Sequence, residues 1–106
     1  MYRFFMTLAI SAGISLTASQ AMAHSALLNC FDNADGTFTC QGGYSDGSSA
    51  TGIRIVVMDK SGTMLQEAQL NADSEVVLPY PNGDFRVLFD GGSGHSVEIT
   101  GDVIMR

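Results

Sequence analysis

The sequence is poor in basic residues and carries little charge of either sign. Among 106 residues there are 5 Lys and Arg against 11 Asp and Glu, for a formal net charge of -6. A protein that binds nucleic-acid phosphates or an anionic membrane surface needs a basic face, so we expect neither partner. With 15% charged and 45% hydrophobic residues, the chain is not a disordered polymer, and its length supports one folded domain.

The chain also lacks the short motifs that mark common enzyme classes. It has no phosphate-binding glycine loop, no HExxH helix and no pair of catalytic carboxylates. The serines between Ser25 and Ser49 have no neighbouring His–carboxylate pair that would suggest a nucleophilic triad. The sequence therefore predicts a protein that is not an enzyme.

No hydrophobic run is long enough to span a membrane, a task that takes about 20 apolar residues. The longest such run, Phe4 to Leu16, follows a single basic residue, and Ala21 and Ala23 then supply the small side chains that signal peptidase accepts. This pattern predicts a signal peptide over residues 1–23, removed after Ala23. The mature domain, residues 24–106, would be exported to a bacterial periplasm without inserting into the membrane.

Cysteine is scarce, and its two positions predict a disulfide. Cys30 and Cys40 flank a stretch with a three-residue turn that ends in Gly36, a common hairpin connection with glycine in the left-handed conformation. In this register Asn33 faces Thr37, and Cys30 faces Cys40. The alternatives, a redox pair or soft metal ligands, are disfavoured because CxxC spacing is absent and the expected compartment is oxidising.

The rest of the chain predicts short strands separated by turns. Residues 53–58 are apolar on both faces, as in the central strand of a sandwich. Residues 63–70 contain good helix formers, but the tight turn before them and the strand after them favour a strand. Further strands are predicted at residues 75–78, 85–89, 95–99 and 103–105. This spacing predicts an all-β fold, a small antiparallel β-sandwich of six to seven strands.

A resemblance to a known fold family rests on Ile53 to Asp90. There a strand leads into the turn Asp59-Lys60-Ser61-Gly62, and two more strands follow before a Pro-Asn-Gly turn. The strand Asp84-Phe85-Arg86-Val87 ends the succession. This order resembles the carboxypeptidase-regulatory-like domain, a transthyretin-like or Cna-B-like sandwich. The likeness implies a fold rather than a function.

A second resemblance rests on the two ends of the mature chain. The N-terminal part has His24-Ser25-Ala26-Leu27-Leu28 with Asp32-Asn33, and the C-terminal part has the glycine-rich run from Gly91 to Ile99. Together they resemble small periplasmic accessory proteins of nickel/cobalt uptake transporters of the energy-coupling-factor type. The resemblance implies capture or delivery of a divalent metal, with a membrane metal transporter component as partner.

The two histidines predict a metal site without reference to any family. Cleavage makes His24 the first residue, so its α-amine and Nδ1 can chelate one ion, and His95 lies in a glycine-rich loop that can approach closely. Three such nitrogens form a histidine brace, which suits Cu(II) or Ni(II). Asp46 and Asp90, the acidic residues nearest the glycine-rich loops, could add oxygen ligands. The alternative is that both histidines are ordinary exposed residues.

These observations predict a secreted, non-enzymatic metal-binding accessory protein. The resemblance favours nickel or cobalt, and the coordination chemistry also allows copper. The alternative hypothesis is a structural or protein-interaction domain of the cell envelope, which would bind a partner through its sheet edges and hold no metal.

Overall fold

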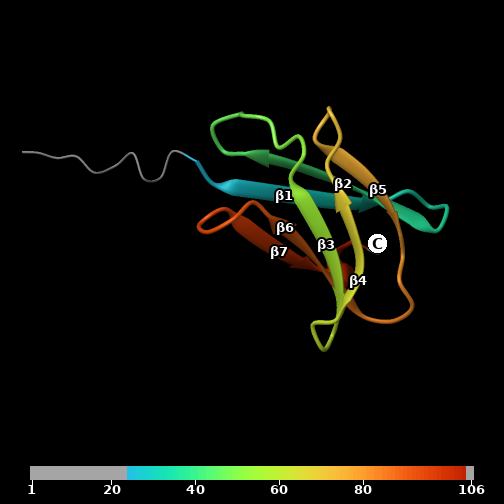
Figure 1. Cartoon of the computed structure of the whole chain (residues 1–106). Coiled ribbons are helices and arrows are strands. Elements are labelled where there is room, and N and C mark those ends of the chain that lie inside the picture. Colours follow the sequence, from blue (N-terminus) through green and yellow to red (C-terminus); the bar gives the residue numbers. More distant parts are fainter. Residues whose placement is uncertain (1–23, 105–106) are drawn as a thin grey trace, which may run out of the picture.

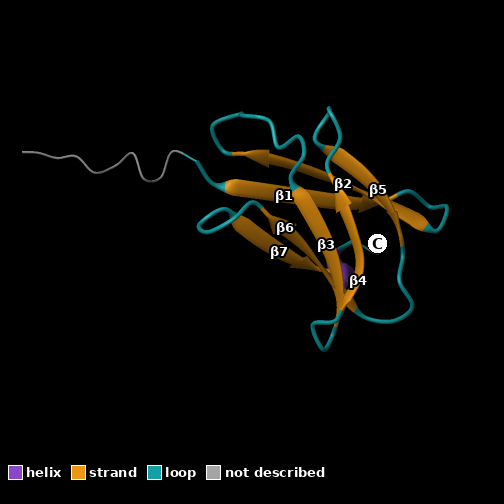
Figure 2. Ribbon diagram, in the orientation of Figure 1, coloured by secondary structure: helices purple, strands orange, loops and turns teal. Residues whose placement is uncertain are grey.

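The computed structural model describes residues 24–104, which form two antiparallel sheets packed face to face (Figures 1 and 2). The predicted signal peptide, residues 1–23, lies outside the described residues. The strands are β1 (Ala26–Asp32), β2 (Thr37–Tyr44), β3 (Arg54–Asp59), β4 (Met64–Gln69), β5 (Glu75–Pro79), β6 (Phe85–Asp90) and β7 (Ser96–Thr100). The three-stranded sheet has the order β1-β2-β5 and the four-stranded sheet β4-β3-β6-β7. The predicted all-β sandwich is confirmed.

The β1–β2 hairpin has the register that the cysteines predicted. Cys30 lies opposite Cys40, and the two form a disulfide. At the turn, the backbone N–H of Asn33 donates to the carbonyl of Thr37 at 3.0 Å, and Gly36 has a φ of +90°. A left-handed glycine at this position gives the connection the twist that antiparallel strands require.

The core lies between the sheets and is built from alternate residues of the inner strands. Phe38, Ile55, Val57, Val87 and Phe89 are completely buried. Burying one such side chain stabilises the fold by about 1.5–3 kcal/mol. β3 is apolar on both faces, as predicted, because Val56 on its outer face is only 4% exposed.

β4 confirms that residues 63–70 are extended in spite of their helix-forming composition. Its residues pair with β3, for example Ala68 with Ile55 and Glu67 with Val56. Pairing with a buried central strand outweighs the intrinsic preference of Leu, Gln, Glu and Ala for a helix. The pairing shifts by one residue between Val57 and Met58, since Val57 pairs with Gln66 and Met58 with Met64.

The end of the chain departs from the prediction. Residues 103–105 were expected to be extended, but a short 3₁₀ helix, η2 (Gly101–Val103), follows β7. The cause is the ring of Phe85, which packs against Gly101 so closely that a Cβ there would lie 2.5 Å from it. The chain turns at this point and buries Ile104. None of the described residues forms a helix long and apolar enough to cross a membrane.

Several turns begin with an aspartate two residues before a serine or threonine. In the β1–β2 turn, Asp35 accepts hydrogen bonds from the hydroxyl and backbone N–H of Thr37. In the β3–β4 turn, Asp59 accepts from the hydroxyl and N–H of Ser61 and from the N–H of Thr63. These donors stabilise the ionised carboxylates, so the pKa values of Asp35 and Asp59 lie below the usual 3.8.

Removing the disulfide should destabilise the domain without changing its fold. The bond closes a hairpin loop and so restricts the unfolded chain, which is worth roughly 2–4 kcal/mol. We expect Cys30→Ala/Cys40→Ala to lose this amount in urea denaturation. The parent protein unfolded with a reductant should lose a similar amount. Equal midpoints for the oxidised and reduced parent would contradict the prediction.

The aspartate turns predict a loss of stability in acid. Because the folded pKa values are lowered, their contribution is present above the unfolded value of 3.8 and is lost as the pH falls below it. Urea denaturation at a series of pH values should show this decline below about pH 4. Asp35→Asn/Asp59→Asn keeps the side-chain acceptors but cannot titrate, so its decline should be shallower. An unchanged pH dependence in this variant would refute the assignment.

Candidate metal centre

Three of the four side chains predicted as metal ligands gather at one end of the sandwich. His24 precedes β1, Asp46 follows β2 and His95 precedes β7. In Figure 1 the start of β1 and the loop between β6 and β7 lie at the same end of the molecule. We call His24, Asp46, His95 and the neighbouring Tyr44 the histidine cluster.

His24 is held by its ring and by the backbone of the next residue. Its Nδ1 lies 2.9 Å from Oδ2 of Asp46, and its ring stacks on Tyr44 with centroids 4.2 Å apart. The N–H of Ser25 donates to the hydroxyl of Ser45 at 2.8 Å, and the carbonyl of Ser25 accepts from the N–H of Ser45 at 2.8 Å. The hairpin pairing thus continues beyond the start of β1 and positions the first residue of the predicted mature chain.

Tyr44 connects the histidines to the core, a role that the sequence analysis missed. Besides stacking on His24, its ring meets Phe89 edge-on at 5.7 Å and His95 at 6.1 Å. The signal was present in the hairpin register, because Tyr44 pairs with Ala26 and continues the inward alternation of β2. Extending the inward alternation of β2 to its last residue would have predicted the inward position of Tyr44.

Asp46 repeats the aspartate turn, with one oxygen left for His24. Its Oδ1 accepts from the N–H of Ser48 at 2.9 Å and from the Ser48 hydroxyl at 2.6 Å, while Oδ2 faces the imidazole. The Ser48 donors, followed by the contact with His24, hold the pKa of this carboxyl well below its usual range. Asp46 therefore presents a fixed negative charge at neutral pH.

His95 meets His24 edge-on, with ring centroids 5.1 Å apart and an interplanar angle of 77°. Its Nδ1 lies 3.2 Å from the carbonyl oxygen of Ser93. A carbonyl oxygen only accepts, so this hydrogen bond assigns the proton to Nδ1 and leaves the lone pair on Nε2. Metal-binding histidines commonly have their second nitrogen fixed in this way.

Gly91 allows the β6–β7 loop to approach the cluster. A Cβ at this position would lie 2.5 Å from the carbonyl oxygen of His95, 3.0 Å from the ring of Phe89 and 3.1 Å from the hydroxyl of Tyr44. Any side chain would therefore displace the backbone of His95. The glycine in the predicted loop is needed for close packing rather than for an unusual backbone angle.

The contacts within the cluster are a hydrogen bond and packed rings. The 2.9 Å between His24 Nδ1 and Asp46 Oδ2 is an ordinary hydrogen-bond length. The 5.1 Å between the ring centroids of His24 and His95 is typical of an edge-to-face pair. These contacts bring the two histidines and the carboxylate side by side.

The side chains alone do not form a complete metal site. Within residues 24–104, no group of three or more His, Cys, Asp or Glu side chains is arranged so that it could hold a metal ion. The ligand set predicted from sequence also includes the α-amine of His24, which exists only after cleavage. A metal bound here would need that amine as a further donor.

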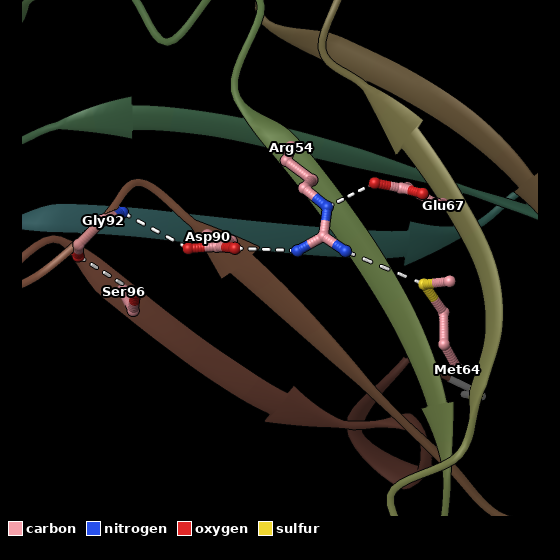
Figure 3. A network of polar contacts seen from close by, with 6 residues as sticks. All are labelled: Arg54, Met64, Glu67, Asp90, Gly92 and Ser96. Carbon is pink, nitrogen blue, oxygen red and sulfur yellow. Dashed lines mark hydrogen bonds and ion pairs between the residues drawn. The ribbon is translucent and has the colours of Figure 1, made fainter.

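Asp90, the fourth predicted ligand, lies apart from the cluster. Its Oδ2 is 2.9 Å from Nη1 of Arg54, which also forms an ion pair with Glu67 (Figure 3). Its Oδ1 accepts from the N–H of Gly92 at 3.3 Å. Phe89 points into the core, so Asp90 points to the outer face of the sheet, where it serves a cross-strand ion pair.

A separate cleft of about 520 Å³ lies beside the start of β6 and the end of β7. Its lining includes Phe85 and four charged residues, the cations Lys60 and Arg86 and the anions Asp84 and Asp102. None of the histidine cluster contributes to it.

Comparison with known proteins adds no relative. No protein-family model, no curated protein and no solved structure matches the chain. The two resemblances drawn from the sequence therefore stay predictions.

Substituting Gly91 should disturb the cluster. Gly91→Ala places a methyl group against the His95 carbonyl and should cost about 1–3 kcal/mol in urea denaturation, as overpacking does. It should also weaken the nuclear Overhauser contacts between the rings of His24 and His95. Gly43→Ala is the matched control, because nothing lies within 4 Å of its added Cβ. If both variants keep the parent's stability and ring contacts, the positioning role of Gly91 is wrong.

Proposed function

We propose that the protein binds a divalent transition metal in the periplasm through the mature N-terminal His24 and the loop residue His95. Nickel and cobalt are the favoured ions, and copper is chemically close. The supporting observation is that the two histidines of the sequence, from opposite ends of the domain, meet at 5.1 Å beside Asp46. The role is binding rather than catalysis.

Two of the donors belong to His24 itself, and the third belongs to His95. Removal of residues 1–23 frees the α-amine of His24, which forms a chelate ring with Nδ1 of the same residue. His95 offers Nε2, because its Nδ1 contacts the Ser93 carbonyl. The stack on Tyr44 restricts the His24 ring, so less side-chain entropy is lost on binding.

The surroundings suit a carrier more than a permanent store. Asp46 supplies a negative charge that attracts a cation and compensates its charge after binding. The His24 side chain is 39% exposed, so the site is open to solvent. Open positions on the metal allow a second protein to add ligands and take the ion. A membrane metal transporter is the partner implied by the resemblance of the two chain ends.

A second candidate function is a protein-interaction domain of the cell envelope that holds no metal. The observation that favours it is a group of exposed apolar side chains on the outer face of the three-stranded sheet. They are Leu27 and Phe31 on β1 and Val77 on β5, exposed by 52%, 42% and 60%. Exposed apolar residues near one another mark interaction surfaces in other proteins.

Metal binding should depend on correct processing of the N-terminus. Calorimetric titration with Ni(II), Co(II) and Cu(II) would compare the mature chain with a chain that has one extra N-terminal residue. The extension turns the amine into an amide, a poor ligand, and should weaken binding at least about tenfold, or about 1.4 kcal/mol. Affinity should rise with pH and binding should release protons, because the donors must be deprotonated.

Two substitutions complete this comparison. His24→Ala should weaken binding at least as much as the extension, since it removes one arm of the chelate. His95→Ala should weaken binding without abolishing it, because the terminal chelate is intact. Equal affinities for the mature and extended chains would end the terminal-chelate hypothesis. No binding of any of the three ions would favour the interaction domain instead.

A further inference from the structure

We propose that Asn82 is a site of spontaneous deamidation, at which the backbone nitrogen of Gly83 attacks the side-chain amide and converts the asparagine to aspartate and isoaspartate. The pair lies in the loop before β6, whereas the loop that carries His95 follows β6. The inference therefore concerns a different part of the molecule from the histidine cluster and does not depend on metal binding.

The reaction needs only water besides the chain itself. The nitrogen of Gly83 loses its proton and bonds to Cγ of Asn82, the bond from Cγ to Nδ2 breaks, and ammonia leaves, which closes a succinimide ring. Water then opens the ring at either of its two carbonyl carbons. Attack at Cγ gives aspartate, and attack at the backbone carbon gives isoaspartate, in which the main chain runs through the former side chain. No atom is oxidised or reduced.

The residue that follows the asparagine leaves the attacking nitrogen accessible. A side chain on that residue would crowd the nitrogen and restrict the backbone, and glycine has none. In this sequence Asn29 is followed by cysteine, Asn33 and Asn71 are followed by alanine, and Asn82 is followed by glycine. Within the described range, a Cβ on Gly83 would lie more than 4 Å from every atom outside the adjoining residues, so the fold does not crowd this position either.

The loop that carries Asn82 is anchored at its two ends and exposed between them. It crosses from the three-stranded to the four-stranded sheet (Figure 1). The N–H of Tyr80 donates to the carbonyl of Gly36 at 3.2 Å, and Phe85 is buried. Between these anchors Asn82 and Gly83 are exposed, and within residues 24–104 neither takes part in a hydrogen bond of the backbone. The pair can therefore reach the geometry for ring closure without disturbing the core.

Two other asparagines also lie in turns, but their side chains are held. Nδ2 of Asn33 donates to the hydroxyls of two threonines of β2, both at 3.0 Å. Oδ1 of Asn71 accepts from two backbone N–H groups that follow it, at 2.8 and 3.1 Å. These bonds must break before Cγ can turn toward the next nitrogen. The structure therefore protects Asn33 and Asn71, whereas Asn82 has no comparable restraint among the described residues.

Deamidation adds a negative charge at the rim of the cleft beside the start of β6. Gly83 and Asp84 line this cleft, and Oδ2 of Asp84 lies 3.6 Å from Nζ of Lys60. The new carboxylate is ionised at neutral pH and enters next to this exposed ion pair. Isoaspartate also lengthens the main chain, but it does so in an exposed loop, so both products keep the fold.

The test is incubation of the folded protein at mildly alkaline pH in water labelled with heavy oxygen, followed by peptide mass spectrometry. We expect one labelled oxygen atom to enter at Asn82, with isoaspartate among the products. Asn33 and Asn71 should react at least about tenfold more slowly. Equal rates at the three sites, or an Asn82 that keeps its amide while unfolded protein loses it, would overturn the proposal.

Ala34→Gly separates the effect of the fold from that of the following residue. It places a glycine after Asn33, and the backbone accepts it because Ala34 already has a φ of +63°. Since the bonds from Asn33 to β2 are kept, we expect Asn33 to stay at least about tenfold slower than Asn82. Equal rates in this folded variant would show that the loop does not select Asn82.

Asn82→Gln tests the assignment by charge. Its longer side chain would have to close a larger ring, so the variant should not produce the acidic species that ion-exchange chromatography separates from the incubated parent. Its midpoint in urea should equal that of the parent, because the side chain is exposed. The same acidic species in Asn82→Gln would place the reaction elsewhere and overturn the proposal.

Discussion

The register of the β1–β2 hairpin is the constraint on which the rest of this structure depends. Opposition of Cys30 and Cys40 sets it, and the same ladder brings Tyr44 opposite Ala26. One step further, the bonds between Ser25 and Ser45 extend the pairing beyond Ala26, the first residue of β1. A shift by one residue would turn every side chain of the strand to the other face, so the cluster exists only in this register.

The parts of the fold that local chemistry determines could be predicted from the sequence. The turn at Gly36 and the inward alternation of β2 gave the pairing of the cysteines, which the structure confirms. The strand assignment of β4 was correct because neighbouring turns outweighed its helical composition. The convergence of His24, Asp46 and His95 could be anticipated because each flanks a strand or a glycine-rich loop.

The parts that failed depend on contacts between distant segments. Asp90 was predicted to lie with the histidines, but it forms an ion pair with Arg54. Arg54 becomes its neighbour only because β6 pairs with β3. Nothing in the local sequence specifies that strand order. The turn after β7 likewise follows from the ring of Phe85, which leaves room only for the glycine at position 101. In both cases the local structure is determined by a side chain from another strand of the same sheet.

The extension of the hairpin past the start of β1 also bears on how long the proposed site would hold an ion. The terminal residues of a strand open locally at a small free-energy cost, far below that of global unfolding. The bonds between Ser25 and Ser45 form the outermost rung of this ladder, beyond the disulfide. Fraying of that single rung would carry the His24 imidazole away from Asp46 while the core stays folded. At the proposed site, the time for which an ion stays bound would then be independent of the lifetime of the domain.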